Sequence, residues 1–280
     1  MNKKEVQKIL KQLNARPQKK FGQNFLIDNN FLNKILNVAN ISKDEIILEV
    51  GAGLGALTEK IAEKARKVYA IEIDPKLISY LKKKFSNFEN VELREGDILK
   101  VDVPFHHKVV SNIPYSITGP LLETLFFKKN PPPGILTIEK TIADRIFFQE
   151  DNKKISRIAI GVNSFMKPIA RFNVPQSSFF PPPRIEPSLI NIKPKDNIDP
   201  FLLERDTREY FLKFVAGIMP YKNKNIGNAL ELFMRNNNRP ILKKEQILKF
   251  LKENNYENNK VLVFDVDDFL KICKLLYDLN

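Results

Sequence analysis

Residues 47–58 read ILEVGAGLGALT, and they decide how the first half of the chain is expected to fold. The apolar run ILEV predicts a buried strand, and LTEKIAEKA (57–65) predicts a helix. Gly51, Gly53 and Gly55 lie between them, where glycines allow a tight turn and let a ligand approach the backbone amides at the helix start. A glycine string is weak evidence by itself, because some strand-to-helix turns need glycine for packing alone.

The segments on either side of the next helix repeat this alternation. Further strands are predicted for KVYAIEI, VELRE, KVVSN and GILTIEK, and helices for PKLISYLKKKF, GPLLETLFF and KTIADRIFF. Strands separated by helices indicate right-handed βαβ units and a parallel sheet covered on both faces. The runs PIARFNV and SLINIKP are joined by a Pro-rich loop with no room for a crossover helix. We therefore expect them to form an antiparallel pair that closes the sheet.

The last third of the chain shows only helical periodicity, in segments such as FLLERDTREYFLKFVAGI and VDDFLKICKLLYDL. The sequence thus predicts an α/β protein. Residues 1–195 are expected to form a Rossmann-like domain whose sheet is mostly parallel with an antiparallel last strand. Residues 196–280 are expected to form a smaller all-α domain.

Composition excludes several classes of function. Cys273 is the single cysteine, and His106 and His107 are the two histidines, so no disulfide framework and no cysteine or histidine metal centre is expected. No apolar run approaches the roughly 18–20 residues that span a bilayer, and the first residues lack the apolar stretch of a signal peptide. We expect a cytoplasmic protein that does not associate with membranes.

The net charge of +13 is unevenly distributed. Residues 196–280 hold 14 basic and 13 acidic residues, whereas the first 195 residues hold 32 basic and 20 acidic residues. A basic field around an active cleft attracts polyanions and speeds their capture, which favours a nucleic-acid partner. A generic lysine-rich surface remains the alternative.

Acidic residues follow two more of the predicted strands. Glu72 ends the strand of IEID and is suited to accept hydrogen bonds from ribose hydroxyls. Asp97 in EGDIL could accept a hydrogen bond from an adenine amine, with Ile98 against the ring. This set fits an adenosine-containing cofactor, either NAD or S-adenosylmethionine. Ala56 stands where the usual NAD-binding pattern has its last glycine, which fits only the relaxed form of that pattern.

The fourth predicted strand runs into VVSNIPYS (109–116). The amide oxygen of Asn112 and the carbonyl of Ile113 could bind both hydrogens of an exocyclic amine and favour the tetrahedral nitrogen of a methyl-transfer transition state. Pro114 stiffens this backbone, and Tyr115 offers an aromatic face to a base. Methyl transfer from S-adenosylmethionine explains the tetrapeptide Asn112–Tyr115, whereas hydride transfer with NAD does not require it. An ordinary strand-to-loop turn is the alternative.

The chain closely resembles the ribosomal RNA adenine N6-dimethyltransferase family. The motifs that carry the resemblance are FGQNFL (21–26), ILEVGAGLGALT (47–58), IEID (71–74), GDIL (96–99), NIPY (112–115) and SSFFPPP (177–183). The resemblance implies a class I methyltransferase fold with S-adenosyl-L-methionine as cofactor. It also implies dimethylation of N6 in two adjacent adenosines of the 3′-terminal hairpin loop of small-subunit ribosomal RNA, a role in ribosome biogenesis, and the small subunit or its precursor as partner. Nothing in the sequence suggests an obligate oligomer, so we expect a monomer.

The resemblance also implies roles for individual residues. The cofactor-binding residues would be Gln23, Asn24, Leu26, Glu49, Gly51, Gly53, Glu72, Ile73, Asp97, Ile98 and Asn112. The catalytic residues at the target base would be Asn112, Ile113, Pro114, Tyr115 and Phe179. Lys19, Lys20 and Arg184 flank the expected mouth of the site and would hold RNA phosphates. The helical domain is expected to recognise ribosomal RNA or the ribosomal surface.

Two alternatives stay open at this point. A large-subunit ribosomal RNA adenine methylase of the antibiotic-resistance type shares related motifs, although the basic N-terminal segment and the helical tail favour the small-subunit branch. A non-catalytic assembly or transcription factor on the same fold is the second. The intact tetrapeptide Asn112–Tyr115 favours retained catalysis.

Overall fold

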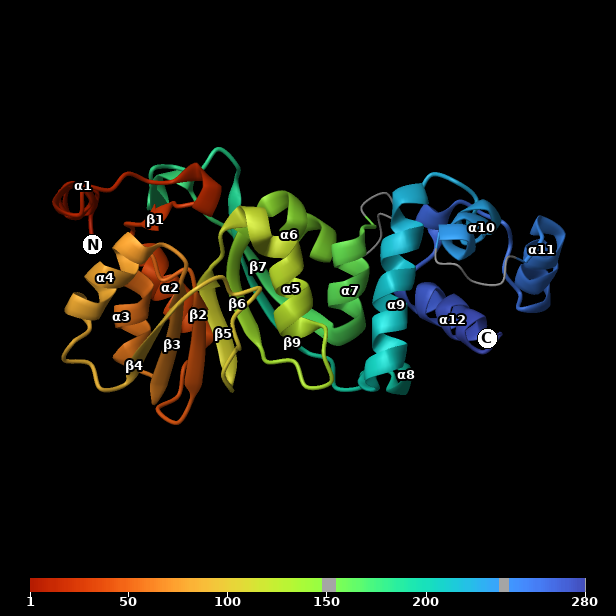
Figure 1. The fold of residues 1–280 in the computed structure, drawn as a ribbon, viewed down its shortest axis with the longest axis horizontal. Helices are drawn as coiled ribbons and strands as arrows, with labels where there is room; N and C mark the ends of the chain where they lie inside the picture. Colours follow the sequence, from red (N-terminus) through yellow and green to blue (C-terminus); the bar gives the residue numbers. More distant parts are fainter. Residues whose placement is uncertain (148–154, 237–241, 280) are drawn as a thin grey trace. The chain divides into compact units, whose positions relative to one another are not determined.

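The computed structural model describes residues 1–147, 155–236 and 242–279. The chain divides into two compact units, Met1–Ala143 with Met166–Pro194, and Asp144–Phe165 with Lys195–Asn280 (Figure 1). This division differs from the expected boundary at residue 195, because Asp144–Phe165 groups with the C-terminal helices. The physical reason is packing: helix α7 (Arg157–Phe165) lies against α9 (Arg205–Ile218) and α12 (Val266–Tyr277).

A seven-stranded sheet forms the centre of the first unit, in the order β4-β3-β2-β5-β6-β9-β7. The first five strands in this order are parallel, whereas β9 runs antiparallel to β6 and to β7. This arrangement confirms the expected Rossmann-like sheet with an antiparallel last strand. The strands are β2 (Ile46–Val50), β3 (Lys67–Glu72), β4 (Val91–Glu95), β5 (Lys108–Asn112), β6 (Gly134–Glu139), β7 (Met166–Asn173) and β9 (Pro187–Pro194).

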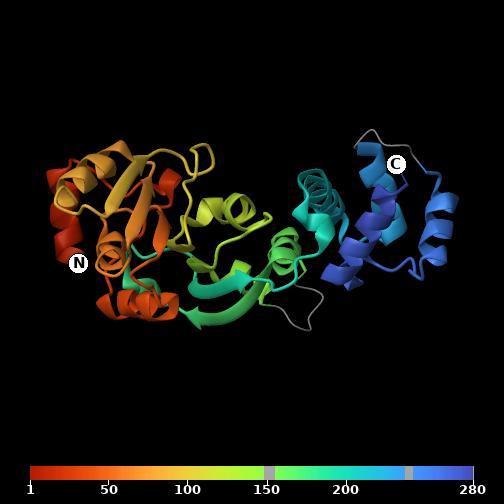
Figure 2. The same cartoon turned by 90° about the horizontal axis from the view of Figure 1, so that it is seen from below.

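Helices cover both faces of this sheet (Figure 2). On one face, side chains of α2 and α3 form a core with Ile47, Val110 and Ile135. Gly134 precedes Ile135 and therefore faces the other way, where a Cβ atom would lie 2.7 Å from Phe126 of α5. Helix α5 thus covers the opposite face. The helices of this unit are α2 (Asn29–Ala39), α3 (Ala56–Ala62), α4 (Pro75–Lys84) and α5 (Thr118–Phe126), and α6 (Lys140–Ile146) crosses the boundary between the two units.

The N-terminal segment adds a small layer at the carboxyl edge of the sheet. Helix α1 (Lys3–Gln12) is followed by a short 3₁₀ turn and by β1 (Phe25–Leu26). Strand β1 pairs antiparallel with β8 (Phe179–Phe180), so that Leu26 lies opposite Phe179 and Phe25 opposite Phe180. The segments FGQNFL and SSFFPPP, far apart in sequence, are therefore hydrogen-bonded neighbours.

The second unit is helical, with a core rich in aromatic rings. Phe214 of α9 contacts Phe233 edge to face at a centroid distance of 5.4 Å and lies 6.4 Å from Phe269. An ion pair of 2.6 Å joins Lys274 of α12 to Asp199, which caps α8. The remaining helices of this unit are α8 (Pro200–Leu203), α10 (Ile226–Asn236) and α11 (Lys244–Glu253). In the described part of the chain, no helix has the length and apolar character needed to cross a membrane.

Candidate active site

A cavity of about 280 Å³ lies at the carboxyl ends of β2, β3 and β5, beneath the N-terminal segment. Ligands of open α/β sheets bind at this edge, where the strand order reverses. Eleven of the predicted site residues line it: Lys20, Gln23, Asn24, Gly51, Gly53, Glu72, Ile73, Asp97, Ile98, Asn112 and Pro114. The sequence motifs therefore converge on one site, although the role of each residue remains a prediction.

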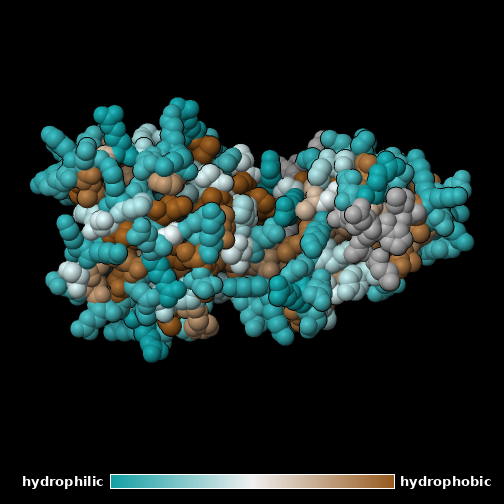
Figure 3. All heavy atoms as spheres, in the orientation of Figure 1, coloured by the Kyte–Doolittle hydropathy of each residue, from teal (hydrophilic) through white to brown (hydrophobic). Residues whose placement is uncertain are grey.

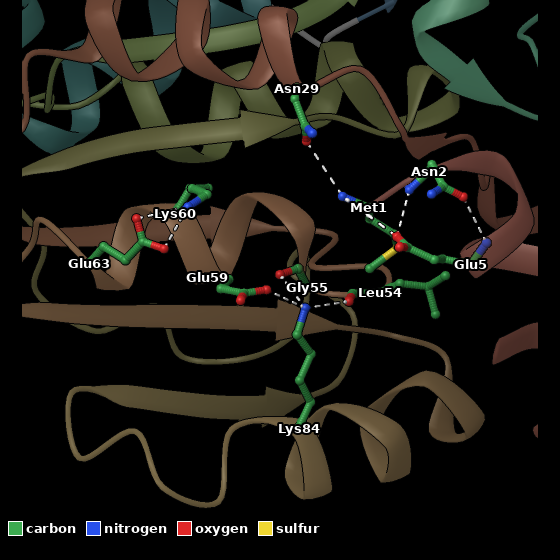
Figure 4. Close-up of polar contacts among 10 residues, drawn as sticks. All are labelled: Met1, Asn2, Glu5, Asn29, Leu54, Gly55, Glu59, Lys60, Glu63 and Lys84. Carbon is green, nitrogen blue, oxygen red and sulfur yellow. Dashed lines mark hydrogen bonds and ion pairs between the residues drawn. The ribbon is translucent and has the colours of Figure 1, made fainter.

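The glycine turn between β2 and α3 forms the floor of this cavity. Gly53 and Gly55 have φ values of +60° and +73°, a region that side chains disfavour. A Cβ atom at Gly55 would also lie 2.6 Å from the ring of Phe85, so this turn requires glycine for packing as well. Lys84 fixes the turn from the end of α4: its ammonium donates to the carbonyls of Leu54 and Gly55 at 3.3 and 3.1 Å (Figure 4).

Glu72 is the buried acid of the site, with 4 % of its surface exposed. One carboxylate oxygen accepts the backbone N–H of Gly53 at 2.8 Å, and the other accepts those of Ile73 and Asp74 at 3.0 Å. Burial raises the pKa of Glu72, and these backbone donors oppose the rise. The three donors hold the carboxylate at the cavity wall, which suits an acceptor for ribose hydroxyls.

Asp97 and Ile98 lie beyond the end of β4 in the same wall. The Asp97 Oδ1 atom accepts the backbone N–H of Leu99 at 3.0 Å, which fixes the direction of the carboxylate. Ile98 is 4 % exposed and supplies an apolar surface beside it. A carboxylate next to an apolar side chain is an arrangement that can bind the amine and the ring of an adenine.

Asn112 ends β5 between this cavity and a smaller neighbouring one of about 40 Å³. Its Nδ2 atom donates to the carbonyl of Asn24 at 3.3 Å, and its Oδ1 atom is buried with no hydrogen-bond partner. Buried acceptors are nearly always paired in folded proteins, so an unpartnered one at a cavity wall indicates a ligand site. The contact with Asn24 turns the amide so that the oxygen is the end left to accept a hydrogen bond.

The other residues of the tetrapeptide differ in their placement. Ile113 is 1 % exposed, and its N–H donates to the carbonyl of Thr137 on β6 at 3.1 Å. Tyr115 begins a 3₁₀ turn after Pro114 and does not line the cavity, although Pro114 and Ser116 on either side of it do. Its hydroxyl is buried without a partner, and burial raises the pKa of this phenol. Tyr115 therefore lies at the cavity margin.

Leu26 and Glu49 line the smaller cavity together with Asn112 and the glycine turn. Glu49 is 2 % exposed, and its Oε2 atom has no hydrogen-bond partner. Burial raises the pKa of Glu49 to about 8. A carboxyl group of this kind is costly to ionise unless a cation or a hydrogen-bond donor enters the cavity beside it.

The expectation that Phe179 covers one face of a target base conflicts with its position. The ring is 2 % exposed, lines neither cavity, and packs edge to face on Phe31 of α2 with centroids 5.9 Å apart. Pairing of β1 with β8 directs this side chain into the core and leaves Phe180, which the sequence analysis did not select, partly exposed. Successive residues of a strand face opposite sides, which is the physical reason for the difference.

The three predicted phosphate-binding residues are exposed. Lys20 lines the cavity, and its ammonium lies 4.5 Å from the ring centroid of Phe21. Lys19 is its neighbour in the same 3₁₀ turn. Arg184 follows the Pro-rich loop and lines neither cavity.

Sequence reasoning missed Asp74, which fastens the N-terminal segment over the cavity. Asp74 is 2 % exposed; its Oδ1 atom caps α4 through the N–H of Lys76 at 3.0 Å. Its Oδ2 atom accepts the side-chain amides of both Gln18 and Gln23 at 2.9 Å. The Gln23 oxygen in turn accepts the N–H of Gln18 at 2.9 Å. The Asp-Pro pair at 74–75 signals a helix start in the sequence, but its bonds to the glutamines depend on tertiary structure.

The site fits the methionine-based cofactor that the sequence suggested. The cavity offers an acid for a ribose, an acid with an apolar neighbour for an adenine, and a glycine turn at a helix start. Its volume of about 280 Å³ is near the lower end of small-molecule sites, and the smaller cavity shares Asn24, Gly51 and Asn112 with it. Asn112, whose Oδ1 atom is unpartnered, lines both cavities.

Comparisons with known proteins agree with this geometry. The sequence pattern of the ribosomal RNA adenine dimethylase family matches residues 2–272. A probable ribosomal RNA small subunit methyltransferase A of Methanosarcina mazei is 33% identical over 277 residues, which cover 98% of each chain. The corresponding protein of Methanococcoides burtonii is 36% identical over 208 residues, covering 74% of this chain and 75% of its own.

Solved structures give the same result. A dimethyladenosine transferase from Plasmodium falciparum superposes with a TM-score of 0.73 at 27% identity, covering 91% of this chain and 97% of its own. The 23S rRNA methyltransferase ErmE superposes with a TM-score of 0.62 at 22% identity, covering 91% of this chain and 100% of its own, which shows a shared fold. Motifs, sheet order, site and matches together show that the chain belongs to the ribosomal RNA adenine dimethylase family, enzymes that methylate adenine in ribosomal RNA.

Proposed function

We propose that this enzyme uses S-adenosyl-L-methionine to dimethylate N6 of two adjacent adenosines in the 3′-terminal hairpin loop of small-subunit ribosomal RNA. The observation that carries the proposal is the buried, unpartnered Oδ1 atom of Asn112 at the junction of the two cavities. The names of the M. mazei and M. burtonii relatives, both small subunit methyltransferase A, support the choice of subunit. The likeness to ErmE concerns the fold alone, so the large-subunit alternative is less well supported.

Different residues of the cavity would bind the different parts of the cofactor. Glu72 would accept the ribose hydroxyls, and Asp97 with Ile98 would bind the cofactor adenine. The glycine turn and Asn24 would border the methionine part. When bound, the cofactor supplies an electrophilic methyl group on a sulfonium. No general base is required, since the amine proton can leave to water after transfer.

Asn112 would orient the acceptor. Its Oδ1 atom and the carbonyl of Ile113 would accept hydrogen bonds from the two N–H groups of the adenine N6 amine. These hydrogen bonds would favour a tetrahedral nitrogen, whose lone pair is no longer conjugated with the ring. The hydrogen bond from Nδ2 to the Asn24 carbonyl at 3.3 Å favours the orientation of the amide in which Oδ1 is free to accept. Pre-positioning of this kind accelerates a reaction that needs in-line geometry.

The target base must leave its stack to reach this site. Tyr115 at the cavity margin would contact the extruded ring, and stacking on one aromatic face is worth roughly 1–3 kcal/mol. Phe180, rather than the buried Phe179, is the partly exposed aromatic of the Pro-rich loop. We expect the first unit to act as the methyltransferase domain, and residues 196–280, the C-terminal part of the helical unit, to recognise the ribosomal RNA or the subunit.

The proposed setting follows from the substrate. An enzyme that modifies small-subunit RNA acts during ribosome biogenesis, on the subunit or its precursor, in the compartment where ribosomes are assembled, which we expect to be the cytoplasm. We further propose that the chain acts as a monomer.

The decisive experiment is transfer of tritiated methyl groups from S-adenosyl-L-methionine to unmethylated small-subunit particles, with naked small-subunit RNA and large-subunit RNA as parallel substrates. Reverse-transcription mapping then locates the label. We expect two adjacent dimethylated adenosines near the 3′ end of the small-subunit RNA. Label confined to large-subunit RNA would establish the alternative, and no label in any RNA would refute catalysis.

A further inference from the structure

Helix α1 has two opposite faces. Val6 and Leu10, four residues apart, are 0 % and 5 % exposed and pack in a cluster with Phe25, Leu54 and Leu77. This face is therefore used to attach the helix to the first unit. The opposite face carries Lys4, Lys8 and Lys11, at spacings of four and three residues, which places them in one stripe.

The three lysines of this stripe are exposed, and none of them has an ion-pair partner among the described residues. Lys4 and Lys11 are seven residues apart, or about 10 Å along a helix. Over that length one strand of a nucleic-acid duplex carries about three phosphates. The stripe therefore matches a short stretch of a phosphate backbone in charge and in length. The visible surface around α1 is largely hydrophilic (Figure 3).

Local interactions hold the helix in place. The side chain of Asn2 accepts the N–H of Glu5 at 3.1 Å, and the Glu5 carboxylate accepts the N–H of Asn2 at 2.8 Å (Figure 4). This capping box occupies Glu5, the single acidic residue before Asp28. Beyond the far end, the ammonium of Lys76 donates to the carbonyl of Asn14 at 2.7 Å. The stripe is thus presented on a fixed helix, and Glu5, the acidic residue next to it, is engaged in the capping box and forms no ion pair with Lys4 or Lys8 among the described residues.

Contacts also connect α1 to the rim of the cavity. The ammonium of Lys3 lies 5.6 Å from the ring centroid of Phe180, Phe180 pairs with Phe25, and Phe25 lines the cavity. Leu54 and Leu77, on which α1 packs, follow the carboxyl ends of β2 and β3. The helix therefore lies at the same edge of the sheet as the candidate active site.

A basic amphipathic helix can also bind a membrane surface, but it does so by inserting its apolar face. Here that face is buried in the protein. The exposed face carries the three lysines, and no apolar side chain lies between them that could insert into lipid. Polyanion binding through phosphates is the chemistry that remains.

We propose that the Lys4–Lys8–Lys11 stripe of α1 binds the phosphate backbone of the ribosomal RNA next to the target adenosines and so orients the RNA at the cavity. This inference rests on the proposed function and extends it to a second contact surface. The lysines would position the RNA rather than read its sequence, because phosphate contacts carry no base information.

The test compares two triple variants of the full chain. Lys4→Gln/Lys8→Gln/Lys11→Gln removes the stripe. Lys43→Gln/Lys64→Gln/Arg66→Gln removes the same charge at the opposite, amino edge of the same sheet, where all three side chains are exposed. Affinity for naked small-subunit RNA and for small-subunit particles is measured from 50 to 300 mM salt, and affinity for S-adenosyl-L-methionine by calorimetry.

We expect the stripe variant to bind RNA roughly 10–100-fold more weakly near 0.1 M salt, with a salt-dependence slope smaller by about 2–3, as expected for three lost phosphate contacts. Its cofactor affinity should equal that of the wild type. The amino-edge variant should keep the wild-type RNA affinity and slope, and Lys→Arg at the three stripe positions should restore both.

Three outcomes would overturn the proposal: unchanged RNA affinity in the stripe variant, equal losses in both variants, or a loss with ribosomal particles that is absent with naked RNA. The last result would assign the stripe to a ribosomal protein. Failure of the proposed function is a separate observation, since it would appear as absent methyl transfer by the wild-type chain.

Discussion

The two edges of the parallel sheet differ in how many buried polar atoms lack a hydrogen-bond partner. At the carboxyl edge, Glu49 Oε2, Asn112 Oδ1 and the Tyr115 hydroxyl are buried without hydrogen-bond partners. At the amino edge, the Lys108 ammonium donates to the carbonyl of Ala39 at 2.8 Å and pairs with Glu45 at 2.9 Å.

Other polar groups of the amino edge are also paired. The N–H of Ile46 donates to His107 Nδ1 at 2.9 Å, and the Asn90 amide donates to the carbonyls of Ala62 and Ala65 at 2.8 and 3.1 Å. His106 Nε2 is the exception among the described residues there. Unpaired buried polar groups lower the stability of the fold. The comparison therefore suggests that the amino edge serves stability, whereas the carboxyl edge keeps hydrogen-bonding groups available for a ligand.

The largest effect should follow from removing the unpaired acceptor itself. Asn112→Ala is expected to lower kcat by about 10²–10³-fold, the usual cost of one lost transition-state hydrogen bond. The Oδ1 atom has no partner in the protein, and loss of the long Nδ2 hydrogen bond to the Asn24 carbonyl (3.3 Å) should lower the free energy of unfolding by only about 1 kcal/mol. Single-turnover methyl transfer and urea unfolding measure the two quantities. Equal losses of stability and rate would contradict the contrast between the edges.

Lys108→Met tests the amino edge. The substitution removes the ammonium donor from the Ala39 carbonyl and leaves the Glu45 carboxylate without its cation, although the N–H of Ser42 still donates to Glu45 at 2.9 Å. The free energy of unfolding should fall by about 2–3 kcal/mol, while kcat of the folded protein stays at the wild-type value. A loss of kcat with unchanged unfolding would show that this lysine serves the reaction instead of the fold.

Glu49→Gln tests how much the buried Glu49 carboxyl lowers the free energy of unfolding when it ionises, measured as a function of pH. The pKa of Glu49 is raised to about 8 from its ordinary value of 4.5, so the folded state binds the proton more tightly than the unfolded chain. The contribution of this group to stability therefore falls as pH rises from 4.5 through 8. Without cofactor, the wild type should lose roughly 2 kcal/mol of stability between pH 6 and 8.5 that Glu49→Gln does not lose. If the free energy of unfolding of the two proteins changed equally with pH, ionisation of Glu49 would carry no such cost.

The smallest effect concerns the fastening of the N-terminal segment. An amide at position 74 cannot both cap α4 and accept from two glutamines, so Asp74→Asn should weaken S-adenosyl-L-methionine binding about 5–10-fold, or roughly 1 kcal/mol. Asp265→Asn, the equivalent change at the cap of α12, is the matched control and should leave cofactor binding unchanged. A double-mutant cycle of Asp74→Asn with Gln23→Ala should show a coupling energy between Asp74 and Gln23. Additive effects of the two substitutions would contradict the role proposed for their hydrogen bond.

The sequence by itself determined the parallel strand series, the antiparallel closing pair and most of the cavity. Period and spacing are local signals, and carboxyl ends of parallel strands meet at one edge whatever the details of packing. For that reason Gly51, Glu72, Asp97 and Asn112, spread over 62 residues of sequence, could be assigned to one site in advance.

Tertiary structure alone decided three other features. Pairing of β1 with β8 buries Phe179 and leaves Phe180 partly exposed, because side chains alternate along a strand and register fixes which one faces inward. The hydrogen bonds of Asp74 to Gln18 and Gln23 join residues more than 50 positions apart. Asp144–Phe165 joins the helical unit because α7 packs on α9. Each depends on which distant surfaces meet, and no local pattern in the chain records that.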